Sequence, residues 1–503
     1  MLPNDSSCSP IRASSVSRRG FFESMSSGLG TAALASLLSQ DLYGGNGLFA
    51  AESSAAAVAG SGQSEFPDQS PKQPHFEPQA KAVIHLFMNG GPSQMDLFDP
   101  KEELTRNHGK SYFDKIAGEV ENPGAAGALM RSPFKFRRHG EVGMDVSELL
   151  PHLATQVDRI SLIRSMYTTN LTHEPALFIA HCGRMNPGLP SLGSWVTYGL
   201  GSENQNLPAY IVLDDPAGLP VNGVQNWQSG YLPPVYQGTR FRATGKPVLN
   251  LDREYEEADS VVKLERDLIG TLDRIHRRRR TGQPQLDARL ASYELAARMQ
   301  LAASDALELS QETALTQKRY GVGGKETDSY GRRCLIARRL IERGVRFVQL
   351  FINFQIWDNH TNIGSALPAA CRKTDQPIAA LLEDLDQRGL LDSTLVAWGG
   401  EFGRLPIAQL GGDKSVLKAG RDHNQNAMVT WLAGAGIKRG HIHGTTDEIG
   451  LKAGDQKVTV HDWHATMLDQ LGMHHQELYY QRNGLKERLT SVFPAKVIEE
   501  ICA

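Results

Sequence analysis

Carboxylates and imidazoles recur in this chain at the points where apolar runs begin or end. Asp358 and His360 follow one such run, Glu401 follows another, and His423 precedes a third. Hard oxygen donors and borderline nitrogen donors on a rigid frame are what a divalent metal ion requires. Such an ion polarises a phosphoryl or sulfuryl oxygen and lowers the pKa of a hydroxyl or water nucleophile.

Each of these residues also has a plain structural interpretation. A polar residue at a strand end often only caps or hydrogen-bonds its loop, and Asp358 to Asn362 is polar enough to form an ordinary turn. Their recurrence at successive strand ends favours a shared site. We therefore carry both interpretations forward, a metal site and a set of structural loop residues.

The elements that position these residues follow from the stretch around Glu401. Pro377 marks a helix start, apolar residues follow it at helical spacing, and Gly389 stands where a helix would end. The apolar run 394–398 then stops at two glycines. A continuous apolar strand fed by a helix is typical of a parallel sheet covered on both faces, which places its chemistry at the carboxyl ends of its strands.

Further apolar runs predict more strands of the same sheet. We expect 82–88, 345–352 and 394–398 to be neighbours or near-neighbours, with another strand near 159–166. The predicted fold class is α/β, a doubly wound, mostly parallel central sheet with helices on both faces. Charged amphipathic segments predict a helical insertion near 250–320.

Composition excludes several classes of protein. The 503 residues are 40% hydrophobic and 22% charged with a net charge of -3, which gives no pull toward nucleic acid or a membrane surface. The basic run 276–280 is typical of a solvated helix face. Five cysteines without a CxxC pair indicate neither a zinc knuckle nor a dense disulfide framework.

The first residues resemble a twin-arginine export signal. Arg18-Arg19 and Phe21-Phe22 precede a mildly apolar stretch of Gly, Ala and Leu that is too short and too weak to span a membrane. The alternative is a tail with a chance arginine pair. We predict a signal region at 1–50, a disordered linker at 51–80 and a folded domain at 81–495, in a protein exported to the periplasm or cell envelope.

Two motifs resemble sulfatases and related phosphate-transferring enzymes. The segment "LLEDLDQRGLLDSTLVAWGGEFGR" is similar to their helix, glycine and strand that lead to Ser-Asp-His-Gly, but Glu401 and Phe402 stand in place of Asp and His. Glutamate can replace aspartate as a ligand, whereas phenylalanine cannot replace histidine. The segment "HEPALFIAHCGR" resembles the sulfatase signature and puts His173 where the nucleophile would be.

The wider set of motifs is closely similar to an exported bacterial family called domain of unknown function 1501, within the alkaline phosphatase and sulfatase superfamily. These motifs are "MNGGPSQMDLFDPK", "GRRCLIARRLIERGVRFVQL", "WDNH", "EFGR", "GRDH" and "VHDWHATML". The resemblance implies a sulfatase-like fold. It also implies that the metal ligands are Asp358, His360, Glu401 and His423, with Asp96 as a further one.

The resemblance assigns further roles with alternatives. His173 would form a phosphohistidine-type intermediate, or Thr172 would attack through its hydroxyl. Arg184 and Arg404 would hold an anionic substrate, or each would make a structural ion pair. Cys182 lies outside the position that a formylglycine sulfatase requires, which disfavours that type of enzyme.

Two functions follow as hypotheses. The first is a metal-dependent hydrolase of phosphate or sulfate esters that uses zinc, manganese or calcium. Its substrate would be an anionic ester such as a sulfated or phosphorylated polysaccharide. The alternative is a non-catalytic sulfatase-like fold that binds an anionic glycan or a protein partner, and Phe402 favours this alternative.

Overall fold

The computed structural model describes residues 69–242, 258–280, 283–352, 354–410 and 418–503. The predicted signal region and most of the predicted linker lie outside these residues. Residues 69–80 correct the linker prediction, because they pack on the domain despite their polar composition. The backbone N–H of Ala80 donates to the carbonyl of Gln470 at 2.7 Å, and the Phe76 ring lies 4.7 Å from that of His474.

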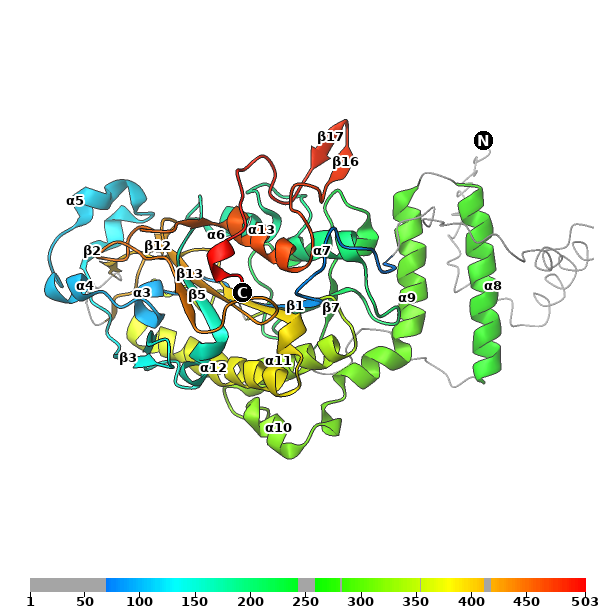
Figure 1. The fold of residues 1–503 in the computed structure, drawn as a ribbon, viewed down its shortest axis with the longest axis horizontal. Coiled ribbons are helices and arrows are strands. Elements are labelled where there is room, and N and C mark those ends of the chain that lie inside the picture. The colour runs from blue at the N-terminus through cyan, green and yellow to red at the C-terminus, as the bar shows by residue number, and fades with distance from the viewer. Residues whose placement is uncertain (1–68, 243–257, 281–282, 353, 411–417) are drawn as a thin grey trace, which may run out of the picture. The chain divides into compact units, whose positions relative to one another are not determined.

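One large sheet forms the centre of the domain (Figure 1). Its strand order is β14-β5-β13-β9-β1-β8-β6-β7, with β15 paired to β5. Every pair is parallel except those of β13, which runs antiparallel to β5 and β9. The strands are β1 (Ala82–Phe87), β5 (Ile160–Tyr167), β6 (Tyr210–Leu213), β7 (Thr239–Phe241), β8 (Phe347–Phe351), β9 (Thr394–Gly399), β13 (Met428–Ala433), β14 (His441–His443) and β15 (Val458–Thr459).

The centre of the sheet confirms the predicted neighbours. β1 pairs with β8 on one side and with β9 on the other, in parallel. All residues of these three strands are buried, as expected for strands covered on both faces. Their carboxyl ends therefore open at the same edge, toward residues 88–92, 352–360 and 400–404.

Helices cover both faces of this sheet, as predicted. α11 (Asp328–Glu342) and α12 (Ile363–Gln387) pack into one hydrophobic core, which includes Leu335 and Leu381. α6 (His173–Cys182), α7 (Leu192–Leu200) and α13 (Val460–Gln470) pack into the other, which includes Trp195 and Met467. The two sets lie on opposite sides of the strands in Figure 1.

α12 corrects one predicted boundary. It begins at Ile363 rather than at Pro377, and it contains both Pro368 and Pro377. Proline is favoured in the first turn of a helix, which is why the sequence suggested a start there. Buried residues on both sides of Pro377, such as Leu367 and Leu381, carry the helix through it.

Smaller elements complete the domain. The helical insertion is confirmed as α8 (Asp259–Arg278), α9 (Pro284–Leu307) and α10 (Ala314–Arg319). Among the described residues, no helix is long and apolar enough to cross a membrane. The remaining elements are α3 (Gln94–Leu97), α4 (Glu102–Arg106), α5 (Phe113–Ile116), β2 (Ala126–Leu129), β3 (Phe136–His139), β4 (Met144–Ser147), β10 (Gly403–Arg404), β11 (Ile407–Gln409), β12 (His423–Asn424), β16 (Tyr480–Arg482) and β17 (Leu485–Glu487).

Candidate metal centre

Three imidazoles meet one carboxylate at the carboxyl edge of the sheet. The Oδ1 atom of Asp358 lies 2.9 Å from Nε2 of His360 and 3.1 Å from Nε2 of His423. Its Oδ2 atom lies 3.3 Å from Nε2 of His173. One ligand atom from each of the four residues lies within 4.8 Å of the other three, so the set can hold one metal ion.

The spacing of these atoms suits a small divalent ion. Ligands that lie roughly 2 Å from one ion are roughly 3 Å from one another, and the three ring nitrogens lie 2.9 to 3.3 Å from the oxygens of Asp358. The Nε2 atom of His173 is buried and lies 3.3 Å from Oδ2 of Asp358, so a bound ion would have to replace this contact. Three nitrogens and one carboxylate form a donor set for zinc, manganese or iron rather than for calcium, which prefers oxygen.

Glu401 stands behind His173 rather than among the ligands. Its Oε1 atom is 2.7 Å from Nδ1 of His173, and both its oxygens accept the backbone N–H of Gly90, at 2.9 and 3.1 Å. The side chain is fully buried and lies outside the group of ligand atoms. Glu401 thus faces the ring of His173, which belongs to the group of potential ligands, and its own predicted role as a ligand stays a prediction.

Two glycines let the loop after β1 pack closely against the neighbouring loops. A side chain at either position would collide with Asp358 or Phe402. Gly90 has φ +113°, and a Cβ there would lie 2.6 Å from the backbone nitrogen of Asp358. Gly91 has φ +73°, and a Cβ there would lie 2.6 Å from the Phe402 ring. Left-handed φ values and contacts this close both favour glycine.

Phe402 forms an apolar wall of the site. Its ring centroid lies 4.8 Å from that of His173 and 4.4 Å from that of His423. It occupies the position where the resembling enzymes have a ligand histidine. The Phe402 ring itself offers no ligand atom to a metal ion.

Burial and hydrogen bonding shift the pKa values of His423 and His173 in opposite directions. Burial lowers the pKa of His423 to about 4, and the nearby Arg404 charge acts in the same direction. Burial also opposes the charged form of His173, but hydrogen bonds to Asp358 and Glu401 outweigh it and raise the pKa of His173 to about 9. His423 is therefore neutral and ready to bind a metal, whereas His173 must first lose a proton.

Asp358 stays ionised. Burial acts to raise its pKa, but hydrogen bonds from His173, His360 and His423 and the charge of Arg404 hold it well below its usual range. The hydrogen bond to Asp358 likewise overcomes burial and raises the pKa of His360. The site thus keeps one permanent negative charge at its centre.

The sequence analysis missed Glu121 and Asp422. Glu121 Oε2 lies 2.6 Å from Nδ1 of His423, and Glu121 Oε1 accepts the Thr172 hydroxyl at 3.4 Å. Burial and the neighbouring Asp422 raise the pKa of Glu121. Glu121 and Asp422 form a second group of potential ligands with His423. Asp422 stands in the "GRDH" motif, but no motif surrounds Glu121.

The other predicted site residues have structural partners. Asp96 makes a fully buried ion pair with Arg421 at 2.6 Å and lies outside both groups of potential ligands. Arg404 is buried and donates to Asp358 Oδ1 at 2.6 Å and to the carbonyl of Gly91 at 2.9 Å. Arg184 pairs with Glu487 at 3.0 Å. Neither arginine is therefore free to hold a substrate in this state of the protein.

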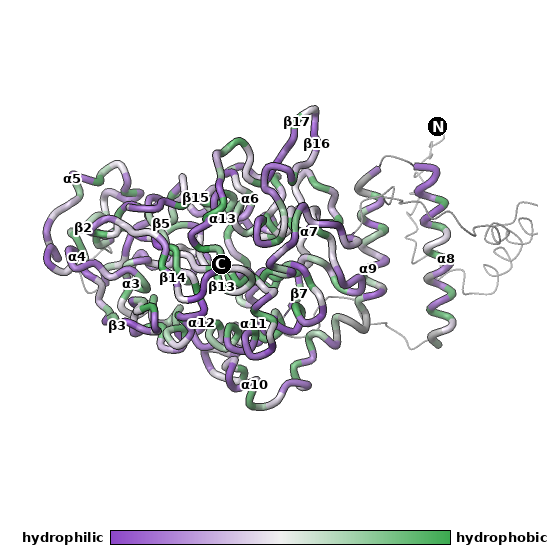
Figure 2. Tube along the Cα trace, viewed as in Figure 1, coloured by the Kyte–Doolittle hydropathy of each residue, from purple (hydrophilic) through white to green (hydrophobic). Residues whose placement is uncertain are grey.

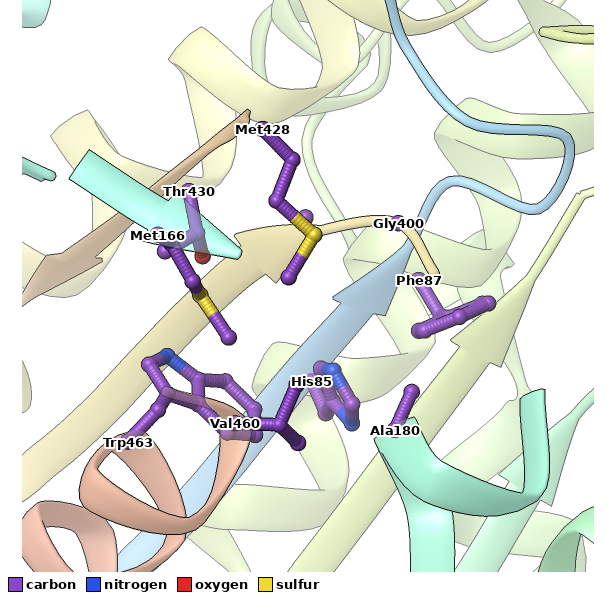
Figure 3. Close-up of a pocket in the computed structure, with 10 residues that line it drawn as sticks. His85, Phe87, Met166, Ala180, Gly400, Met428, Thr430, Val460 and Trp463 are labelled. Carbon is purple, nitrogen blue, oxygen red and sulfur yellow. The ribbon is translucent and has the colours of Figure 1, made fainter. Parts of the chain in front are cut away.

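A small cavity beside Gly400 is lined by His85, Met166, Met428 and Trp463 among others, and by none of the potential ligands (Figure 3). Its volume is about 20 Å³. That is room for about one water molecule and not for an ester. The group of potential ligands reaches solvent at His360, whose side chain is 31% exposed.

Comparisons with known proteins give a family and several similar folds. The model of a family described as a protein of unknown function (DUF1501) matches residues 80–502. No curated protein matches the chain in sequence.

Three solved structures similar to this chain are enzymes. The lipoteichoic acid synthase LtaP from Listeria monocytogenes has 8% identity and a TM-score of 0.34, over 84% of this chain and 79% of that chain. The phosphonate monoester hydrolase SpPMH from Silicibacter pomeroyi has 8% identity and a TM-score of 0.32, over 83% and 76%. The alkaline phosphatase from the Antarctic bacterium TAB5 has 13% identity and a TM-score of 0.30, over 74% and 95%.

Proposed function

Because this chain belongs to the DUF1501 family, a family of unknown function, its activity must be inferred from its own site, and we propose that it is a metal-dependent hydrolase of phosphate or sulfate esters. The observation that carries the proposal is the convergence of His173, His360 and His423 on Asp358. These residues come from three separate stretches of the chain, and a purely structural network needs no such grouping of ring nitrogens.

The proposed ion would be held by Asp358, His360, His423 and deprotonated His173. When bound, it would polarise a phosphoryl or sulfuryl oxygen of the substrate. The N-terminus of α6 begins at His173, and its positive dipole end favours an anionic ester beside the ion. The substrate class is therefore an anionic ester, and a sulfated or phosphorylated polysaccharide is the candidate that fits export.

Thr172 and Glu121 supply the proposed nucleophile and base. Thr172 is exposed at the N-cap of α6, and its hydroxyl donates to Glu121, whose raised pKa makes it a stronger base than an ordinary carboxylate. The Thr172 oxygen bonds to phosphorus or sulfur as its proton passes to Glu121, and the ester oxygen leaves with the electrons of the broken bond and takes up that proton to become an alcohol. Water then releases phosphate or sulfate and restores the threonine.

We also propose that the protein reaches the periplasm or cell envelope by the twin-arginine route. The support is the sequence of the first 50 residues, with Arg18-Arg19 before an apolar stretch. The route carries folded proteins and is compatible with a metal loaded before export.

One observation favours the non-catalytic alternative. Arg404 already neutralises Asp358 at 2.6 Å, and protonated His173 balances Glu401, so the site is charge-balanced without an ion. In that case the same surface would bind an anionic glycan or a protein partner. The alternative predicts a folded protein without bound metal.

Metal analysis and two variants separate these functions. We expect about one divalent ion per chain in protein purified from its export compartment, with hydrolysis of p-nitrophenyl phosphate or sulfate. His423→Ala should lose both the ion and the activity, because it removes a ligand. Thr172→Val should keep the ion and lose the activity. Protein that contains no metal, and binds none when zinc or manganese is added, would end the enzyme proposal; metal without hydrolysis would favour the binding protein.

A further inference from the structure

Helix α8 carries an apolar stripe on a face of its own. We define this stripe as Val261, Leu264, Leu268, Leu272 and Ile275, whose spacing of three and four residues places them on one side of a helix. Val261 is 46% exposed, Leu264 70% and Leu272 45%, and the other two are partly exposed. Leucine and valine side chains therefore face solvent along most of the helix.

The opposite face of α8 contacts its neighbour α9, and the two helices run antiparallel side by side (Figure 1). Val262 is only 8% exposed, and Arg277 pairs with Asp287 of α9 at 2.9 Å. On a helix, Val262 and Arg277 lie on the side away from the stripe. Packing on α9 thus explains one face of α8 and leaves the stripe uncovered among the described residues.

The charged residues of α8 are distributed unevenly along its length, with basic residues concentrated at its C-terminal end. Exposed Glu265 and Asp267 lie in its first half together with exposed Lys263, whereas exposed Arg274 and Arg278 lie in its second half. Figure 2 shows the hydrophilic colour gathered at the C-terminal end of the helix and apolar bands before it. A second α8 that ran antiparallel would bring acidic residues against basic ones, whereas a parallel one would align like charges.

We propose that the apolar stripe of α8 is a dimer interface that packs, antiparallel, on the stripe of a second copy of this chain. A two-fold axis near Gly270 sets Leu268 of one copy against Leu272 of the other, and it places Asp267 beside Arg274 of the second copy. Such an interface is isologous, so each contact occurs twice. Spacings of three and four residues, which here run 3, 4, 4 and 3, are also the pattern by which helices pack at a shallow angle.

The first test is the mass of the purified full chain in solution. One chain has a mass of 55.2 kDa, and we expect light scattering after gel filtration to give twice this mass at micromolar concentration. Leu264→Glu with Leu272→Glu should halve the measured mass, because the interface would then bury unpaired carboxylates. The matched control is Leu315→Glu, which changes a leucine 64% exposed on α10 and should leave the dimer intact.

A charge reversal tests the antiparallel direction. Asp267→Arg should weaken dimerisation at least tenfold, and adding Arg274→Asp should restore it, because each pair is then merely exchanged. A monomeric wild type, or a dimer that survives the double glutamate substitution, would refute the proposal. A monomer that protects residues 1–68 from protease only while the stripe is intact would show that the chain's own N-terminal region covers it, and binding to anionic vesicles by the monomer would assign it to lipid.

Discussion

His173 shows how the residue behind a side chain decides what that side chain can do. Its Nδ1 atom faces the buried carboxylate of Glu401, so the proton of the neutral ring is held there and Nε2 is left to face Asp358. A histidine backed by a carboxylate is a more basic and better-oriented metal ligand. The same contact raises its pKa, so the site gains a strong ligand that must first release a proton.

Replacing Glu401 should therefore weaken metal binding without removing a ligand. We expect Glu401→Gln to lower the affinity for zinc or manganese about 10- to 100-fold, as for other residues that orient a ligand histidine. Titration calorimetry of metal-free protein would measure this change. Glu487→Gln, at a carboxylate paired with Arg184 away from the site, is the control and should have no effect. Complete loss of binding in Glu401→Gln would restore Glu401 as a direct ligand.

The raised pKa of His173 also predicts how metal affinity depends on pH. Below about 9 this ring is protonated in the metal-free protein, so binding must displace one proton. We expect the apparent affinity to rise at least about tenfold per pH unit between pH 7 and 9, because His360 also has a raised pKa and adds to the slope, while His423, with a pKa of about 4, adds nothing. His173→Gln should bind more weakly and flatten the profile. A wild-type affinity that does not change over this range would contradict the assigned protonation.

At the scale of elements, the sequence was sufficient to predict the central strands of the sheet. Uninterrupted apolar runs predicted β1, β8 and β9 as buried parallel strands, and their adjacency follows from the rule that such strands open at one edge. This brought Asp358 and His360 near His423 before any coordinates. The start of α12 was missed because tertiary packing overrides the local preference of Pro377.

What the sequence could not predict was which atoms face each other within the loops. Glu401 and Asp96 both follow buried strands, yet one orients His173 and the other pairs with Arg421. Such outcomes depend on ångström-scale side-chain directions rather than on residue type or spacing. Glu121 was missed for a different reason, because it comes from an irregular segment far from the other ligands in sequence.

In the loop after β1, Gly91 lies so close to the Phe402 ring that a side chain there would collide with it. We therefore predict that substitution of Gly91 destabilises the protein. Gly91→Ala should cost about 1–2 kcal/mol for the left-handed backbone and about 1–3 kcal/mol more for the contact with the Phe402 ring. Chemical denaturation would measure the free energy of unfolding. Gly109→Ala is matched, because its φ is +83° and a Cβ there meets nothing within 4 Å, so it should show the backbone cost alone. Equal losses would mean that the loop gives way around Phe402.

At the scale of the whole molecule, the proposed metal site and the proposed dimer interface use different segments of the chain. The metal ligands come from the loops at the edge of the sheet, and the dimer stripe belongs to α8, which contributes no residue to the ligand group. Mutations over 7–10 Å apart with no shared partners act independently. The stripe variants should therefore change the mass in solution and leave the metal content at its wild-type value.

The proposed export by the twin-arginine route depends on the guanidinium groups of Arg18 and Arg19. Lysine keeps the charge but lacks the planar fork of arginine, so a receptor that reads the pair should distinguish the two residues. We expect Arg18→Lys with Arg19→Lys to retain the protein in the cytoplasm, measured by immunoblots of cell fractions. Arg137→Lys with Arg138→Lys, at an exposed arginine pair in β3, is the matched control and should be exported normally. If the first double variant reaches the periplasm at wild-type levels, the pair at 18–19 is a chance occurrence, and metal loading before export loses its rationale.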